Sequence, residues 1–387
     1  MVSQAKEMLS GSIIPFWHEL RDSEHGGFYG LVSFDLSVDK KAVKGCILNS
    51  RILWFFSSAH LTLGGDSLLD DARHAYQFLR DHCVDRENGG VYWSLNHDGS
   101  TADSSKHTYN QAFAVYALAA YYEASGDNEA IELAMEIFRL IESKCTDNAG
   151  YLEAFDKTFK PVPNEKLSEN GVMASKTMNT LLHLFEAYSG LYQAKKNTVV
   201  EKSLRRILNI FAGKVYNPQK NRLEVFFDED MNSIIDLHSY GHDIEASWLL
   251  DWGTPMLCDD ALTGKISAIG SDLAKKILET AYHDHSIWYE CEKGENAVYR
   301  EWWAQAEALI GFLNEYQKHP EKKEYLDAAN SIMSYIQKYL VDTRHGSEWF
   351  ARVDESGRPD KSKAIVDPWK CPYHNGRMCL EIIKRCS

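Results

Sequence analysis

Basic residues are scarce in this sequence relative to acidic ones. Its 42 Lys and Arg residues face 56 Asp and Glu residues, so the formal net charge is −14. Binding to a nucleic-acid backbone or to an anionic membrane surface needs a surplus of basic side chains. We therefore expect neither nucleic acid nor a membrane among the partners of this protein.

Long apolar segments are also lacking. No stretch approaches the roughly 18 uninterrupted apolar residues of a membrane-spanning helix, and residues 1–11 lack the apolar core of a signal peptide. These absences predict a cytoplasmic protein. The 8 cysteines form no C-x-x-C pair, which favours reduced thiols over a disulfide framework or a zinc site.

Linkers and cofactor-binding motifs are missing as well. The sequence has no Pro/Ser/Gly-rich linker and no low-complexity segment, so we expect one domain over residues 1–387. It has no G-x-G-x-x-G fingerprint, no P-loop and no G-x-S-x-G elbow. We therefore expect a protein that works without a cofactor.

Helical periodicity dominates what is present, and it repeats. Apolar residues recur at steps of three and four in residues 69–79, 131–141 and 326–336. The second segment follows the first by about 65 residues, and the third follows the second by about three times that distance. A Gly-then-aromatic turn recurs at similar spacing, as in residues 26–29 and 89–93. The chain thus holds about six units, each with two helical patterns.

Six helical hairpins predict an all-α fold, the (α/α)6 barrel of about twelve helices, with short β-hairpin loops at one end. The even-numbered helices are the more apolar, which identifies them as the inner wall. The longer connections follow the odd-numbered helices and should meet at the end of the ring where a site lies. The helices are expected approximately at residues 3–20, 46–63, 67–83, 107–124, 127–144, 174–193, 197–214, 240–252, 269–285, 302–317, 322–340 and 374–384.

The first turns of the predicted inner helices carry polar residues where a core helix should be apolar. Because an unpaired buried charge or imidazole costs several kcal/mol, such positions around one cavity predict a polar ligand. Taken singly, Arg51 would also suit a structural counter-ion, and His183 a hydrogen-bonded core residue. The residues are Arg51, Tyr109, Asn110, Asn179, His183, His242, Glu245, Trp302, Trp303, Glu307, His374, Asn375 and Arg377.

Two spacings around His242 bear on its chemistry. His242 and Glu245 lie three residues apart and share a helix face, so we expect the carboxylate to orient the imidazole and raise its basicity. His238 and His242 have the i, i+4 spacing of metal ligands. There is no H-E-x-x-H motif, however, and His238 precedes the predicted helix, so we expect no metal site.

Aromatic residues and imidazoles together indicate a sugar-converting enzyme. Trp302, Trp303 and Trp369 are predicted at the cavity mouth, where sugar rings would pack their C–H faces on indole. The imidazoles of His242 and His374 suit removal of a proton beside a carbonyl group and its return from another direction. The guanidinium group of Arg51 would stabilise the enediolate oxygen that develops as the proton leaves.

Several segments resemble those of bacterial cellobiose 2-epimerases, which are members of the N-acylglucosamine 2-epimerase superfamily. They read KGCILNSRILW at 44–54, SENG at 168–171, KTMN at 176–179, HSYGHDIEA at 238–246 and WKCPYHNGRMC at 369–379. The resemblance runs nearly end to end. It implies an (α/α)6 barrel and reversible inversion at C2 of a reducing-end aldose.

The resemblance also implies a role for each matching residue. His374 would take the C2 proton, His242 would deliver it to the opposite face, and Glu245 would support His242. Between these steps the cis-enediolate rotates about C2–C3. The remaining implied contacts are Arg51, Tyr109 and His183 with the intermediate, Asn179 with the sugar hydroxyls, Trp303 and Trp369 with the two sugar rings, Trp302 as a further substrate-binding residue beside Trp303, and Glu307 as a polar contact.

The expected substrates are cellobiose, lactose and cello- or manno-oligosaccharides, converted by a monomer. Four alternatives stay open at this point. An N-acylglucosamine 2-epimerase and a mannose isomerase belong to the same superfamily. A glycoside hydrolase on an (α/α)6 barrel would need two opposed carboxylates, and a non-catalytic sugar-binding protein would have no use for paired histidines.

Overall fold

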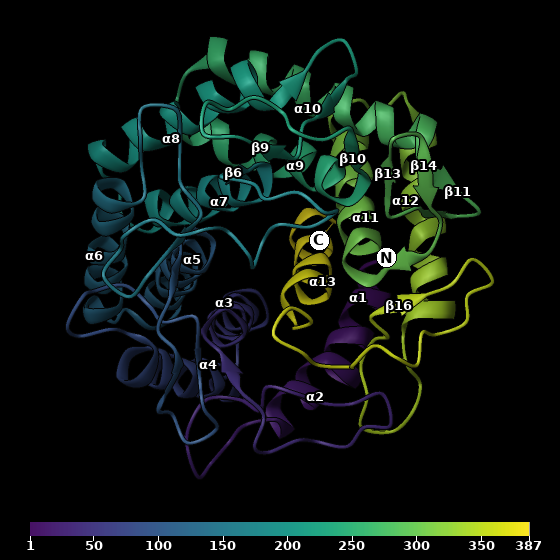
Figure 1. The fold of residues 1–387 in the computed structure, drawn as a ribbon. Helices are drawn as coiled ribbons and strands as arrows, with labels where there is room; N and C mark the ends of the chain where they lie inside the picture. The colour runs from purple at the N-terminus through teal and green to yellow at the C-terminus, as the bar shows by residue number, and fades with distance from the viewer. Residues whose placement is uncertain (387) are drawn as a thin grey trace.

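The computed structural model describes residues 1–386. Viewed along its axis, the molecule is a closed double ring of helices (Figure 1). The inner helices are α3 (Cys46–Leu63), α5 (Thr108–Ser125), α7 (Met178–Ala194), α9 (Tyr240–Gly253), α11 (Trp302–Lys318) and α13 (Tyr373–Cys386). The outer helices are α1 (Val2–Met8), α2 (Ile14–Glu19), α4 (Asp66–Phe78), α6 (Asn128–Lys144), α8 (Thr198–Ile210), α10 (Asp260–Thr280) and α12 (Lys323–Tyr335).

The two layers differ in burial as their composition predicts. In α3 every residue from Cys46 to Ala59 is buried, because this helix has neighbours on all sides. In α4 burial follows one stripe, which includes Ala72, Ala75 and Tyr76, while the opposite face meets solvent. α13 packs against both α1 and α3, so the end of the chain closes the ring. The predicted (α/α)6 barrel is confirmed.

Helix boundaries agree with the predictions within a few residues, with one exception. α10 begins at Asp260, nine residues before its predicted start. The side chain of Asp259 caps this helix by accepting from the backbone N–H of Leu262. Several outer helices end in a π-helical turn, as α4 does at Leu79–Cys83. The π-helical turn Leu9–Ile13 instead connects α1 to α2 without a break.

Short antiparallel strands hold the inner helices at one end of the barrel. A strand directly precedes each of five inner helices: β1 (Lys44–Gly45), β4 (Lys106–His107), β6 (Lys176–Thr177), β10 (Leu237–Ser239) and β15 (Arg300–Glu301). Their respective partners lie in the next long connection: β2 (Ser94–Leu95), β5 (Ala154–Phe155), β9 (Phe226–Phe227), β13 (Glu290–Glu292) and β16 (Arg352–Val353). A bridge between Val32 and Val366 makes the sixth junction.

The remaining strands extend these junctions or close the recurrent turns. β3 (Thr101–Asp103) and β14 (Glu295–Ala297) pair with β2 and β13. β7 (Tyr216–Asn217) pairs with β8 (Arg222–Leu223), and β11 (Tyr282–His283) pairs with β12 (Ser286–Ile287). The Gly-then-aromatic turns of the first two units are closed by the bridges Arg21–Phe28 and Val84–Val91, which confirms the internal repeat. Among residues 1–386, no helix is long and apolar enough to cross a membrane.

A buried lysine anchors the start of several inner helices, a feature that we did not predict. Lys44 Nζ lies 2.6 Å from Asp22 Oδ2, and Lys106 Nζ lies 2.9 Å from Asp85 Oδ2. Each lysine lies two residues before an inner helix, and each aspartate lies in the turn that follows an outer helix. Each ion pair therefore joins the strand that precedes an inner helix to the turn that follows an outer helix.

Removing one partner of such a pair should destabilise the barrel. Lys106→Ala leaves the buried Asp85 carboxylate without its cation, so we expect the free energy of unfolding to fall by about 3–5 kcal/mol, measured by urea denaturation. The matched control is Arg358→Ala, because the Arg358 side chain pairs with Asp354 while 81% exposed. Its effect should stay below about 1 kcal/mol. Equal effects of the two substitutions would contradict the anchoring role.

Candidate active site

The polar first turns of the inner helices surround a cavity of about 300 Å³ at the end of the barrel where the junction strands lie. Because each site residue sits at or near the start of its helix, helices far apart in sequence present their first turns to one space. The structure brings ten of the predicted site residues to its wall: Arg51, Tyr109, Asn179, His183, His242, Glu245, Trp302, Trp303, Trp369 and His374.

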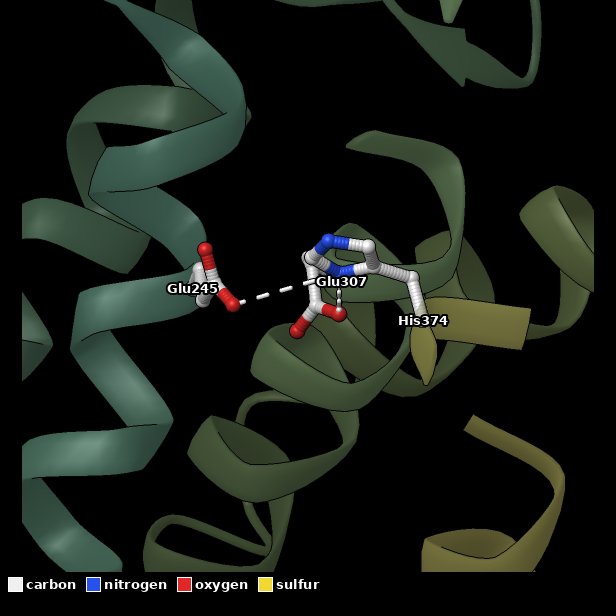
Figure 2. Close-up of side chains that lie close together, drawn as sticks. All are labelled: Glu245, Glu307 and His374. Atoms are coloured by element: carbon white, nitrogen blue, oxygen red, sulfur yellow. Dashed lines mark hydrogen bonds and ion pairs between the residues drawn. The ribbon is translucent and has the colours of Figure 1, made fainter. Parts of the chain in front are cut away.

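His374, the second residue of α13, is oriented by a carboxylate from α11. Its Nδ1 lies 2.7 Å from Oε1 of Glu307, the shorter of the two dashed lines in Figure 2; the longer one joins Nδ1 to Oε1 of Glu245 at 3.9 Å. Since an ionised carboxylate only accepts hydrogen bonds, Nδ1 donates and Nε2 keeps its lone pair. Burial, and next the charge of Arg377, lower the pKa of His374 well below its usual range. His374 is therefore a neutral base.

Glu307 lies behind His374 and not on the cavity wall. Its Oε1 also accepts from Arg377 at 2.8 Å, and its Oε2 accepts from the indole Nε1–H of Trp248 at 2.9 Å. Both oxygens are thus occupied within a fully buried carboxylate. This corrects the expectation that Glu307 contacts the ligand, because its acceptor positions are already used by the protein.

His242, the third residue of α9, is oriented by a hydroxyl group. Its Nδ1 lies 2.7 Å from Oγ of Ser239, the residue that precedes α9. The expected pairing of His242 with Glu245 is wrong, because Oε1 of Glu245 accepts from Arg377 instead. A hydroxyl can donate or accept, so either tautomer of His242 is compatible with Ser239. Burial, with a smaller contribution from His183, lowers the pKa of His242 to about 3.

Glu245 points into the network below the cavity. Burial, reinforced by the negative charge of Glu307, raises the pKa of Glu245 to about 7. Its Oε2 is buried and accepts no hydrogen bond from residues 1–386. Glu245 is therefore a carboxyl group that can hold a proton near neutral pH.

Arg51 provides a cation from α3, the helix that lies across the inner ring from α9 (Figure 1). Its Nη2 donates to the hydroxyl of Tyr109 at 2.7 Å, and its Nη1 donates to the carbonyl of Trp369 at 3.3 Å. Burial raises the pKa of Tyr109 to about 12, so its hydroxyl stays protonated. Within the described residues, Arg51 Nε and Asn179 Oδ1 are buried without partners, as expected of groups that meet a polar ligand.

The three predicted tryptophans differ in exposure and neighbours. Trp369 is 38% exposed and lines the cavity. Trp303 packs against both imidazoles, with ring centroids 4.8 Å from His242 and 5.5 Å from His374. Trp302 is 4% exposed and meets His374 edge-on. Trp303 and Trp369 are thus the better candidates for contact with a sugar ring.

Glu245, Glu307 and His374 form the one cluster in residues 1–386 with a metal-like arrangement, since their ligand atoms lie within 4.8 Å of one another (Figure 2). Nη2 of Arg377, however, donates to Oε1 of both carboxylates. The guanidinium therefore occupies the cationic position of the cluster. His238, the other metal candidate, binds Oδ2 of Asp243 at 2.8 Å.

Sequence analysis missed Glu186 and gave Arg377 no role. Glu186 lies three residues after His183 on α7, and its Oε2 lies 2.8 Å from Nδ1 of His183. This is the spacing that we used for His242 and Glu245, applied to the wrong histidine. The long connections add further wall residues that no helical pattern predicts: Leu167, Glu169, Tyr289, Glu290, Lys363 and Asp367.

Known proteins resemble this chain over its whole length. A cellobiose 2-epimerase of Eubacterium cellulosolvens is 50% identical, covering 98% of this chain and 97% of the relative. The crystal structure of a sugar epimerase from a ruminal bacterium is 49% identical, covers 100% and 99% of the two chains, and superposes with a TM-score of 0.98. A D-mannose isomerase structure, 19% identical with a TM-score of 0.86 over 100% and 98%, shares the fold.

A family model agrees with these relatives. The model of N-acylglucosamine 2-epimerase matches residues 26–375, a range that contains every residue of the cavity wall. The cavity, the paired histidines and the helices from α3 to α12 all lie within this match. The chain therefore belongs to the N-acylglucosamine 2-epimerase family.

Proposed function

We propose that this protein is an isomerase that reversibly inverts C2 of the reducing-end glucose of β-1,4-linked disaccharides, converting cellobiose to 4-O-β-D-glucosyl-D-mannose and lactose to epilactose. The observation that carries this proposal is that His242 and His374 reach one cavity from different helices with different partners. Full-length relatives named cellobiose 2-epimerase support the choice of substrate.

The reaction begins with opening of the sugar ring, which exposes the C1 aldehyde and acidifies the C2–H bond. Nε2 of His374 takes the C2 proton, because Glu307 keeps the other nitrogen protonated. The electron pair moves into a C1–C2 double bond, and negative charge collects on the C1 oxygen. Arg51 and the Tyr109 hydroxyl supply positive charge and a hydrogen bond for this oxygen.

Inversion requires the proton to return to the other face of C2. After rotation about C2–C3, the Nε2–H of neutral His242 gives its proton to C2 and the aldehyde re-forms. Ser239 allows this switch, since its hydroxyl can accept from or donate to Nδ1 as the tautomer of His242 changes. His242 then takes up a proton from solvent while His374 releases the one it holds, so that the cycle leaves both histidines neutral and makes no net change in protons.

The carboxylates argue against a glycoside hydrolase. A retaining or inverting hydrolase places two carboxyl groups about 5–10 Å apart, on either side of the scissile bond. Glu245 and Glu307 instead bind the same guanidinium nitrogen, and Glu307 does not reach the cavity. The pair of groups that reaches the cavity from α9 and α13 is therefore His242 and His374, and Glu245 and Glu307 are not placed as an opposed carboxyl pair.

Alanine substitution of either histidine should abolish epimerisation. We expect His242→Ala and His374→Ala to lower kcat on cellobiose about 10²–10⁴-fold, because each removes one proton-transfer group. Proton NMR in heavy water measures this directly as deuterium appears at C2. His345→Ala, which changes an exposed histidine, is the control. Release of glucose by the wild-type protein would contradict the proposed function.

The pH below which kcat/KM begins to fall should be unusually low. Burial lowers the pKa of both histidines, that of His242 to about 3 and that of His374 well below its usual range, so neither should become charged near its ordinary pKa. We therefore expect kcat/KM to show no acid limb near 6.5, the ordinary pKa of histidine. The protein is first held at pH 5 and returned to pH 7, which excludes unfolding. Because the pKa of Glu245 on the same wall is about 7, the profile is also measured for Glu245→Gln, and a limb at 6.5 that persists in this variant would contradict a neutral buried base.

Glu307→Gln should test how His374 is oriented. Glutamine has one acceptor oxygen and one amide N–H, so it cannot accept from His374, Arg377 and Trp248 at once, and it lacks the negative charge that keeps the proton of His374 on Nδ1. We expect kcat to fall about 10²–10⁴-fold while KM changes little, because Glu307 does not line the cavity. Steady-state kinetics separates the two constants. A large rise in KM at unchanged kcat would instead indicate direct contact with substrate.

A further inference from the structure

Trp248 is a buried tryptophan that the proposed mechanism does not use. It lies on α9, the helix that carries His242, and is 2% exposed. Its indole Nε1–H donates to Oε2 of Glu307 at 2.9 Å, and among residues 1–386 this is the one hydrogen bond that Oε2 accepts. Trp248 does not line the cavity, so it can act on the reaction only through its neighbours.

The two oxygens of Glu307 are held from different helices. Oε1 accepts from Nδ1 of His374 at 2.7 Å and from Nη2 of Arg377 at 2.8 Å, and both of these residues lie on α13. Oε2 accepts from Trp248 on α9. A carboxylate held at one oxygen can still turn about the bond that joins it to its side chain, whereas a donor at the second oxygen fixes its plane. The indole N–H therefore fixes the acceptor that meets His374.

The same N–H favours the ionised form of Glu307. Burial, with a smaller contribution from the charge of Glu186, raises the pKa of Glu307, while Arg377 and the N–H of Trp248 act to lower it. A buried carboxylate oxygen without a donor is costly, and a proton on that oxygen removes the cost. An indole nitrogen donates and cannot accept, so a proton on Oε2 would face the N–H of Trp248. Trp248 thus opposes protonation of Glu307 at this oxygen.

We propose that Trp248 is a positioning residue for the proton transfer. Its indole N–H holds Glu307 ionised and in one orientation, and Glu307 in turn keeps the proton of His374 on Nδ1. The proposal rests on the proposed function for its consequence, because it concerns the base that takes the C2 proton. Since α9 also carries His242, one helix presents the second proton-transfer group and helps to fix the tautomer of the first.

Trp248→Phe tests the positioning role. It removes the N–H and keeps an aromatic ring near the guanidinium of Arg377, whose Cζ lies 4.8 Å from the centroid of the indole. We expect kcat on cellobiose to fall about 10–100-fold, the effect of losing one hydrogen bond to a charged group, with KM changed less than about threefold. Steady-state kinetics separates the two constants. Retention of wild-type kcat by Trp248→Phe would overturn the role.

The matched control is Trp17→Phe. Trp17 lies on α2 and is fully buried, and its Nε1–H has no hydrogen-bond partner among residues 1–386. This variant loses the same volume without losing a hydrogen bond, so it should be less stable and keep kcat. Benzothienylalanine in place of Trp248 makes the converse change, because sulfur replaces the N–H and both rings remain; it should lower kcat as Trp248→Phe does. Wild-type kcat in this last protein would assign the effect to volume and overturn the proposal.

A double substitution tests whether Trp248 acts through Glu307. Two residues that act through one contact give non-additive effects. We therefore expect Trp248→Phe to lower kcat less than about threefold when Glu307→Gln is already present. A further 10–100-fold fall in that background would show that Trp248 acts independently of the Glu307 carboxylate, contrary to the proposal.

The tautomer of His374 can be measured without a sugar. In protein labelled with ¹⁵N-histidine, two-bond proton–nitrogen NMR correlations show which ring nitrogen carries the proton, and His374→Asn assigns the signal. At pH 7 we expect the proton on Nδ1 in the wild-type protein and in Trp17→Phe, and a larger share on Nε2 in Trp248→Phe. An unchanged tautomer in Trp248→Phe would overturn the proposal. If the wild-type protein exchanges no sugar proton, the proposed function fails while this NMR result still stands or falls by itself.

Discussion

The structure depends on one guanidinium group. Arg377 binds Glu186, Glu245 and Glu307, which come from three neighbouring helices of the inner ring. Its plane also lies against the rings of Tyr373 and Trp248. Without this cation, three carboxylates would share a dry interior at a cost of several kcal/mol each. Arg377 thus permits the acidic groups that orient the imidazoles to be buried at all.

Three histidines on one cavity acquire different chemistry from their partners. Glu307 fixes the tautomer of His374, so that histidine presents a lone pair. Ser239 leaves His242 free to exchange tautomers. His183 lies between two carboxyl groups. Because the side chains are identical, the difference arises entirely from the residues behind them, which come from other turns and other helices.

Much of this architecture could be predicted because it is periodic. The repeated helical pattern predicted which helices form the inner wall. Because His242 and His374 occupy the first turns of two of these helices, the pattern also predicted that they share one cavity. Contacts between side chains on different helices follow no periodic pattern in the sequence. Nothing local shows that Glu307 meets His374, 67 residues away. The i, i+3 rule, which is local, predicted a partner for His242 that in fact binds Arg377, because two residues on one helix face can still turn to different neighbours.

The lysine anchors at the start of the inner helices have a consequence for how such a barrel can diversify. Lys44 and Lys106 fasten their strands to turns behind them, so the first turns of the helices do not rely on the tips of the long connections for their position. The outer wall residues, such as Glu169 and Glu290, belong to those connections. The long connections can therefore be exchanged, lengthened or lost over evolutionary time while the histidines of the first helical turns keep their spacing.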